Sequence, residues 1–169
     1  MSQGLNKYCL DTNVLIQPWQ KYYSPKLCPD YWSVLNTLGE QGIVFLPQIV
    51  YEEIIRTDDD LTEWLKRSNI PVLSPDTNVT NILRTIFEVN PLHRTLVDNT
   101  KNRSLADPWV IAHALNEKAI VVTKEEKVTQ VNATRIRIPN VCENMGVTWI
   151  NDFEFIDRMR IKFSCKIIT

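Results

Sequence analysis

Four acidic residues lie close to the point where a strand-like apolar segment ends or a helix-like segment begins: Asp11, Glu53, Asp107 and Glu125. Ligands bind at the carboxyl ends of the strands in a parallel α/β sheet, so acids at these ends are the strongest candidates for chemistry. Carboxylates that converge at one sheet edge repel each other unless a cation neutralises them. Oxygen ligands without a matching Cys or His set favour a hard cation, Mg²⁺ or Mn²⁺. Such an ion can activate a water and stabilise the charge on a phosphodiester under attack.

Each acid taken alone also has an ordinary structural interpretation. Asp11 can cap the helix that follows it. Asp107 precedes a proline and has the pattern of a helix N-cap, with Ser104 three residues earlier as part of a capping box. Glu53 borders the apolar face of its predicted helix, whereas the neighbouring Glu52 is expected to face solvent. The metal-site hypothesis therefore depends on the four acids together.

Short apolar runs alternate with longer amphipathic runs, which predicts β/α units around a buried, mostly parallel sheet. The expected strands are Lys7–Leu10, Ile43–Leu46, Ile70–Leu73, Ala119–Thr123, Arg135–Ile138 and Val147–Ile150. The expected helices are Pro29–Glu40, Pro47–Arg56, Asp59–Ser68, Asn78–Val89, Ala106–Glu117 and Asn151–Arg158. A sheet of this size needs helices on both faces, so we expect a three-layer α/β/α sandwich.

The composition indicates one globular domain over residues 1–169. The chain has 19 Lys and Arg against 20 Asp and Glu, a formal net charge of −1, which excludes a protein that coats nucleic acid by bulk positive charge. The four cysteines form no C-x-x-C pair, so neither a zinc site nor a disulfide scaffold is expected. The sequence shows no signal peptide and no apolar run long enough for a membrane span, and we expect a cytoplasmic protein.

Four segments, in this order, resemble the PIN domain, a family of metal-dependent ribonucleases. They are Leu-Asp-Thr-Asn-Val-Leu at 10–15, Pro-x-x-Val-x-x-Glu-Ile at 47–54, Ala-Asp-Pro-Trp-Val-Ile-Ala-His-Ala at 106–114, and Val-Val-Thr-x-Glu at 121–125. The match covers about residues 7–150 and leaves a C-terminal helix and a basic tail. A further segment, Ile-Pro-Asn-Val-Cys-Glu from residue 138, resembles a poorly characterised group of PIN-like domains.

The resemblance implies that Asp11, Glu53 and Asp107 hold Mg²⁺ or Mn²⁺. Glu125 stands where many PIN domains have an aspartate. The extra methylene displaces its carboxylate, which is then expected to reach the metal through water. Three further polar positions match the surroundings of the metals: Asn13, Thr123 and Ser104.

The resemblance also implies the function and the partners. Many small prokaryotic PIN domains are toxins of toxin–antitoxin pairs, so the expected activity is hydrolysis of RNA, with a small antitoxin that covers the site and a homodimeric assembly. The main alternative is a PIN scaffold without activity that binds RNA or a protein, because Glu125 departs from the usual acid. A phosphoaspartyl phosphatase is disfavoured, because Asn13 stands where that class has its second acid.

The C-terminal residues Arg158, Arg160 and Lys162 alternate with apolar residues, so an extended tail would have one basic face. We expect an amphipathic edge strand slightly more than an RNA-binding strip. His93 is expected in a solvated loop and His113 packed on its helix. The five tryptophans are expected to anchor the core or an interface.

Overall fold

The central sheet has five parallel strands in the order β3-β2-β1-β4-β5, in a computed structural model that describes residues 5–97 and 105–169. The strands are β1 (Tyr8–Leu10), β2 (Val44–Pro47), β3 (Val72–Leu73), β4 (Ile120–Val122) and β5 (Trp149–Ile150). Every pairing between neighbouring strands is parallel. The central position of β1 places the end of this strand between the ends of β2 and β4.

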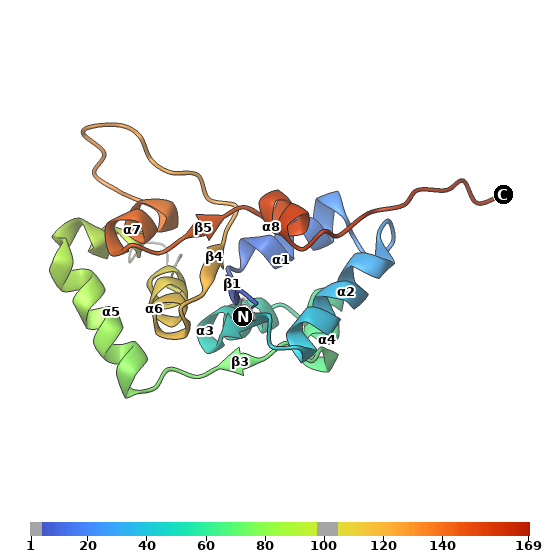
Figure 1. The fold of residues 1–169 in the computed structure, drawn as a ribbon, viewed down its shortest axis with the longest axis horizontal. Helices are drawn as coiled ribbons and strands as arrows, with labels where there is room; N and C mark the ends of the chain where they lie inside the picture. The colour runs from blue at the N-terminus through green and yellow to red at the C-terminus, as the bar shows by residue number, and fades with distance from the viewer. Residues whose placement is uncertain (1–4, 98–104) are drawn as a thin grey trace.

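Helices cover both faces of this sheet. They are α1 (Asn13–Gln17), the π-helical η1 (Pro18–Tyr22), α2 (Pro29–Glu40), α3 (Gln48–Ile55), α4 (Asp60–Arg67), α5 (Thr77–Val89), the 3₁₀ helix η2 (Pro91–Leu96), α6 (Asp107–Glu117), α7 (Ile138–Met145) and α8 (Asp152–Arg158). Figure 1 shows α5, α6 and α7 on one side of the sheet and α1, α2 and α8 on the other. This arrangement confirms the expected three-layer α/β/α sandwich. Within the described residues, no helix is long and apolar enough to cross a bilayer.

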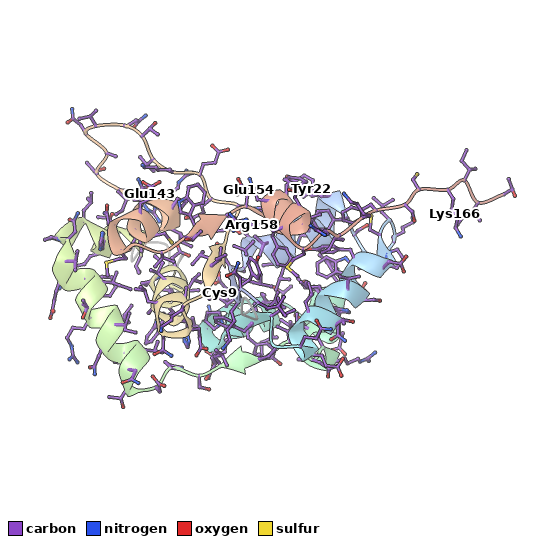
Figure 2. All side chains as sticks on the ribbon, in the orientation of Figure 1. Cys9, Tyr22, Glu143, Glu154, Arg158 and Lys166 are labelled. Carbon is purple, nitrogen blue, oxygen red and sulfur yellow. The ribbon has the colours of Figure 1, made fainter. Side chains whose placement is uncertain are left out.

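The central strands β1 and β2 are buried along their whole length because helices pack on both sides of them, whereas the edge strand β3 is partly exposed. Cys9, Val44, Leu46 and Val121 are fully buried, and α6 packs across β1, β2 and β4. Figure 2 shows Cys9 at the middle of this packed layer. Burial explains why the strands appear in the sequence as continuous apolar runs instead of alternating ones.

Two tryptophans, Trp19 and Trp64, pack against the buried Trp32. The ring centroids of Trp19 and Trp32 are 4.7 Å apart, and those of Trp32 and Trp64 are 5.1 Å apart. The three rings join η1, α2 and α4 on one face of the sheet. For these three residues the expected role as core anchors is confirmed.

The strand expected at Arg135–Ile138 is wrong. Residue Ile138 is the first residue of α7, and Arg137 before it is extended, with φ −123° and ψ 173°. Pro139 explains the difference, because a proline in the first turn of a helix has no N–H to lose and its fixed φ suits the helix. The apolar pair Ile136 and Ile138 is buried, but as a helix entry and not as a strand.

The C-terminal tail forms no edge strand either. The described residues after α8 are irregular, and Arg160 has a left-handed backbone with φ 54°. The alternation of side chains is nevertheless present, because Ile161 packs against the core while Arg158, Arg160 and Lys162 are exposed. Figure 1 shows the C-terminal end pointing away from the three layers, and Figure 2 shows Lys166 on this segment.

Candidate functional site

Asp11 lies at the tip of the central strand β1 and is held there by two donors. Its side chain is 3% exposed. The backbone N–H of Thr12 donates to Oδ1 at 2.8 Å, and the hydroxyl of Thr123 donates to Oδ2 at 2.8 Å. The backbone N–H of Asp11 donates to the carbonyl of Val122 at 3.0 Å, which ties the tip of β1 to β4. The carboxylate is therefore fixed in orientation, with one donor on each oxygen.

The surroundings of Asp11 favour its protonated form. Burial raises the pKa of Asp11 to about 7, and the charge of Glu125 is the next largest cause, with a smaller contribution from Glu53. The hydrogen bonds from Thr123 and Thr12 act in the opposite direction and lower the pKa. Three of the four candidate acids therefore influence one another, as expected for carboxylates that gather at one edge of the sheet.

Glu53 approaches the same edge from α3, which begins directly after β2. Its side chain is half-buried, and Oε2 accepts a hydrogen bond of 3.1 Å from the hydroxyl of Thr12. Glu52 is exposed and accepts a hydrogen bond from Gln48 at 2.6 Å. The expected division between an inward-facing and a solvated glutamate is confirmed.

Asp107 is the first residue of α6, and it is 9% exposed. Ala106 occupies the N-cap position, so the expected N-cap role of Asp107 is wrong by one residue. A carboxylate in the first turn still interacts favourably with the positive end of the helix dipole. Ser104, expected to orient this acid, lies outside the described residues.

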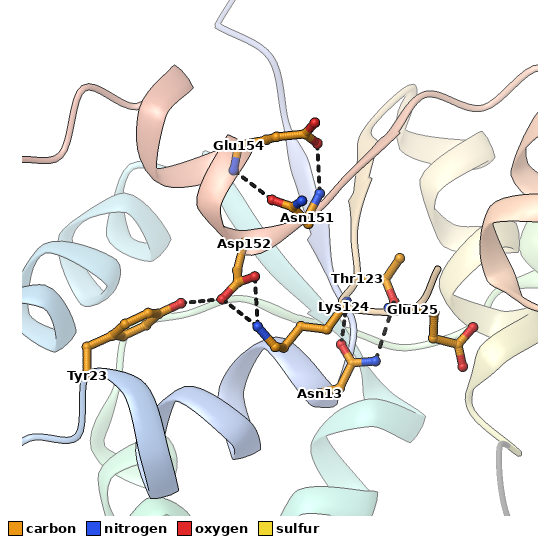
Figure 3. Close-up of polar contacts among 8 residues, drawn as sticks. All are labelled: Asn13, Tyr23, Thr123, Lys124, Glu125, Asn151, Asp152 and Glu154. Carbon is orange, nitrogen blue, oxygen red and sulfur yellow. Dashed lines mark hydrogen bonds and ion pairs between the residues drawn. The ribbon is translucent and has the colours of Figure 1, made fainter. Parts of the chain in front are cut away.

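The segment that follows β4 connects the remaining polar residues. Asn13 donates to the hydroxyl of Thr123 at 3.4 Å and accepts from the backbone N–H of Lys124 at 2.9 Å. The backbone N–H of Glu125 donates to the same hydroxyl of Thr123 at 3.1 Å. The carboxylate of Glu125 accepts the backbone N–H of Ile138 at 2.9 Å. Figure 3 shows Asn13, Thr123 and Glu125 together at this sheet edge. The structure thus links the fourth acid to Asp11 through one threonine hydroxyl.

A buried ion pair lies beside these residues and was missed in the sequence. The amine of Lys124 is 3.0 Å from both carboxylate oxygens of Asp152, whose side chain is 2% exposed. The phenol of Tyr23 donates to Asp152 at 2.6 Å. In Figure 3, Tyr23 and Lys124 approach Asp152 from two different elements. A signal was available, because Asp152 follows the end of β5 as Asp11 follows the end of β1.

The donor set at this edge suits a hard divalent cation. Asp11, Glu53 and Glu125 offer carboxylate oxygens there, which Mg²⁺ and Mn²⁺ prefer, and Asp107 offers a further carboxylate from the start of α6. The nearby thiols of Cys9 and Cys142 are buried, and burial raises the pKa of each, so both stay protonated and are poor ligands. Among residues 5–97 and 105–169, no three Asp, Glu, His or Cys side chains already form a ligand set for one ion.

The two histidines take no part in this edge. His93 is fully buried in η2, where its ring contacts the carbonyl of Ile86 at 2.6 Å and the amide of Asn144 at 2.9 Å. The expectation of a solvated loop is therefore wrong, because 3₁₀ structure at Pro91–Leu96 turns the ring inward. His113 is buried on α6, as expected, and burial lowers its pKa.

Replacing Thr123 by valine tests whether this hydroxyl orients the site. Valine has nearly the same shape but cannot donate to Asp11 or accept from Glu125 and Asn13, so we expect Mn²⁺ affinity to fall about 10–100-fold. Titration calorimetry measures the affinity, with Thr129→Val in the exposed segment after β4 as the control. Equal affinities in wild type and Thr123→Val would show that the hydroxyl does not orient the acids.

The fold resembles those of three solved structures. FitAcB from Neisseria gonorrhoeae is 19% identical with a TM-score of 0.57, and the alignment covers 86% of this chain and 98% of that chain. VapBC2 from Rickettsia felis, bound to a DNA fragment from their promoter, is 16% identical with a TM-score of 0.54, covering 85% and 97%. FitAB bound to an IR36 DNA fragment is 19% identical with a TM-score of 0.55, covering 85% and 94%. These similarities confirm the PIN-like fold.

Comparison by sequence gives one family and no individual relative. A family model described as "Domain of unknown function (DUF4411)" matches residues 8–163. A search of curated proteins gives no significant match. The matched range includes all four candidate acids, the ion pair of Lys124 and Asp152, and the whole sheet.

Proposed function

Because the chain belongs to the DUF4411 family and has a PIN-like fold, we propose that it is a metal-dependent endoribonuclease. The observation that carries the proposal is the gathering of acids at the end of the central strand. Asp11 is buried there, and its pKa is raised to about 7 by burial and by the charges of Glu125 and Glu53. Such a shift is common at functional sites, where burial and like charges adjust the pKa values of the acids.

Asp11, Glu53 and Asp107 would hold Mg²⁺ or Mn²⁺, and Glu125 would act beside them. The ion would supply an activated water and a positive charge for the phosphodiester. Neighbouring side chains and backbone groups orient the acids for this reaction. Thr12 and Thr123 each hold one oxygen of Asp11, so its carboxylate is oriented before the substrate arrives. The hydroxyl of Thr12 also donates to Glu53, so one residue contacts both Asp11, through its backbone N–H, and Glu53, through its side chain.

Single-stranded or looped RNA is the proposed substrate, because its phosphodiesters are more accessible than those of a duplex. The net charge of −1 provides no general attraction for RNA, so local bases must contact the phosphates. Arg158, Arg160 and Lys162 are exposed and are proposed for this contact. The PIN-like fold also supports a small antitoxin as a protein partner. We propose in addition that the chain forms a homodimer.

Cleavage of short labelled RNA, with and without EDTA, tests the proposal. We expect cleavage with Mg²⁺ or Mn²⁺, loss with EDTA, and recovery when Mn²⁺ is added in excess. The uncleaved control is the Asp11→Asn protein prepared in the same way. Cleavage that persists in EDTA and in Asp11→Asn would reject metal-dependent hydrolysis at this site.

A PIN scaffold that binds RNA or protein without cleaving is the second candidate. Two observations favour it: the described acids do not form a ready ligand set, and Glu125 is engaged with the backbone of Ile138. This candidate predicts RNA binding by wild type and Asp11→Asn with equal affinity and no cleavage by either. The same labelled RNA, used in a binding assay, separates the two functions.

A further inference from the structure

Glu125 serves the first turn of α7, whose N-cap residue makes no side-chain cap, although the side chain of Asn140 accepts the N–H of that residue at 3.2 Å. A helix begins with backbone N–H groups that lack partners inside the helix, and Ser, Thr, Asp or Asn at the N-cap usually accepts one of them. Arg137 holds the N-cap position of α7, and its guanidinium has only donors. The first helical N–H, that of Ile138, donates instead to Oε2 of Glu125 at 2.9 Å. Pro139 has no N–H, and the N–H of Asn140 donates to the carbonyl of Arg137 at 3.0 Å.

The backbone of Glu125 is held at the same time by the acid site. Its N–H donates to Thr123, whose hydroxyl donates to Asp11. The glutamate side chain therefore spans the distance from the edge of the sheet to the start of α7. An aspartate in the same place is shorter by up to about 1.5 Å, the length of one carbon–carbon bond. With its backbone held by Thr123, an aspartate would not reach the N–H of Ile138.

Further contacts connect the segment between β4 and α7 to the helix. The side chain of Asn140 accepts from the N–H of Val128 at 3.0 Å and donates to the carbonyl of Val128 at 2.9 Å. Lys127 forms an ion pair with Glu143. Of the residues that make these contacts, Glu125 is the one linked to Asp11 through Thr123. These contacts attach the segment 126–137 to α7. The attachment nearest the acid site is made by Glu125.

We propose that Glu125 is a positioning residue, which holds the start of α7 against the acid site and acts on Asp11 by its charge without binding the metal ion directly. This inference rests on the proposed function for its metal-binding part. It explains why a glutamate stands at position 125, where many PIN domains have an aspartate. The longer side chain accepts the first N–H of α7 and does not contact the metal ion. Asp11, Glu53 and Asp107 are then the direct ligands.

Two substitutions distinguish the effect of the length of the Glu125 side chain from the effect of its negative charge. Glu125→Asp keeps the negative charge but shortens the side chain, so it no longer accepts the N–H of Ile138. Glu125→Gln keeps the side-chain length and an acceptor oxygen but removes the charge. Glu126→Asp and Glu126→Gln, at the exposed neighbouring residue, are the matched controls. Amide hydrogen exchange at Ile138 reports the cap, and titration with Mn²⁺ alone reports the metal site.

In Glu125→Asp we expect exchange at Ile138 to accelerate about tenfold or more, while Mn²⁺ affinity changes less than about threefold. In Glu125→Gln we expect exchange close to wild type and Mn²⁺ affinity lowered by about tenfold or less, through the lost charge. Unchanged exchange at Ile138 in Glu125→Asp would overturn the capping role. Loss of Mn²⁺ affinity in Glu125→Gln as large as in Asp11→Asn would make Glu125 a direct ligand and overturn the proposal.

Failure of the proposed function gives a different result. If the wild type binds no Mn²⁺, the metal-dependent function is rejected, and exchange alone decides the role of Glu125. Faster exchange in Glu125→Asp only, with the Glu126 controls unchanged, then supports its position as the cap of α7. Equal exchange in all five proteins overturns it.

Discussion

Asp11→Asn is expected to abolish RNA cleavage and, in the same protein without metal, to increase stability at pH 8. Loss of a direct metal ligand removes several kcal/mol of transition-state stabilisation, so activity should fall by about 10³-fold or more. The gain in stability has a separate cause. The folded protein raises the pKa of Asp11 from 3.8 to about 7, so it binds this proton more tightly than the unfolded chain does. The stability that this group contributes is complete below pH 3.8 and is lost as the pH rises through 7.

Asparagine at position 11 removes the cost of burying a charged carboxylate, because its side chain carries no charge at any of these pH values. We expect the free energy of unfolding of the metal-free variant to exceed that of wild type by roughly 2–4 kcal/mol at pH 8, or about 5–10 °C in Tm. The difference should narrow at pH 5, where folded Asp11 is mostly protonated. Mg²⁺ should stabilise wild type and not the variant.

Thermal unfolding at pH 5 and pH 8, with and without Mg²⁺, measures these differences. Asp58→Asn, at an exposed acid away from the sheet edge, is the control and should be neutral. If Asp11→Asn is less stable than wild type at pH 8 without metal, then the carboxylate of Asp11 is not under electrostatic strain. That result would remove the main support for a cation site.

Lys124→Met is expected to cause a large loss of stability. The amine of Lys124 is 3.0 Å from both oxygens of Asp152, and the two side chains are 13% and 2% exposed. Methionine fills a similar volume but leaves the buried carboxylate without a counter-charge. Breaking a buried ion pair in this way costs about 3–5 kcal/mol, or roughly 10 °C in Tm for a chain of this size.

The ion pair of Lys127 and Glu143 is the matched control, because it lies on the same segment and is exposed on both sides. Lys127→Met should cost less than about 1 kcal/mol. The double variant Lys124→Met and Asp152→Asn should recover most of the stability, because it removes both buried charges. Equal losses for Lys124→Met and Lys127→Met in chemical denaturation would show that the burial of the first pair has no energetic effect.

The sheet and most helices could be predicted from the sequence, because buried parallel strands leave continuous apolar runs. The helix expected at Pro29–Glu40 has the same bounds in the structure, and the strands at β1, β2 and β4 differ by one residue or two. The end of β1 directed attention to Asp11. The same rule applied to β5 points to Asp152, which lies two residues beyond the end of that strand, as the first residue of α8.

The pairings across the site could not be predicted, because they depend on packing between distant segments. The sequence gives Lys124 no partner, and only the structure brings it to Asp152, which also accepts from Tyr23. The burial of His93 could not be predicted because its two partners, Ile86 and Asn144, lie on α5 and α7. Glu125 could be recognised as an unusual acid, but its contact with Ile138 requires the position of α7.

The hydrogen bond between Thr123 and Asp11 joins residues 112 positions apart in the chain. Ribosomes add about 5–20 residues per second, so on the order of ten seconds separates the synthesis of these two residues. During that time the nascent chain has Asp11 but lacks β4, Glu125 and the helix that Glu125 holds. The acid site of this fold is therefore incomplete until most of the chain has been translated.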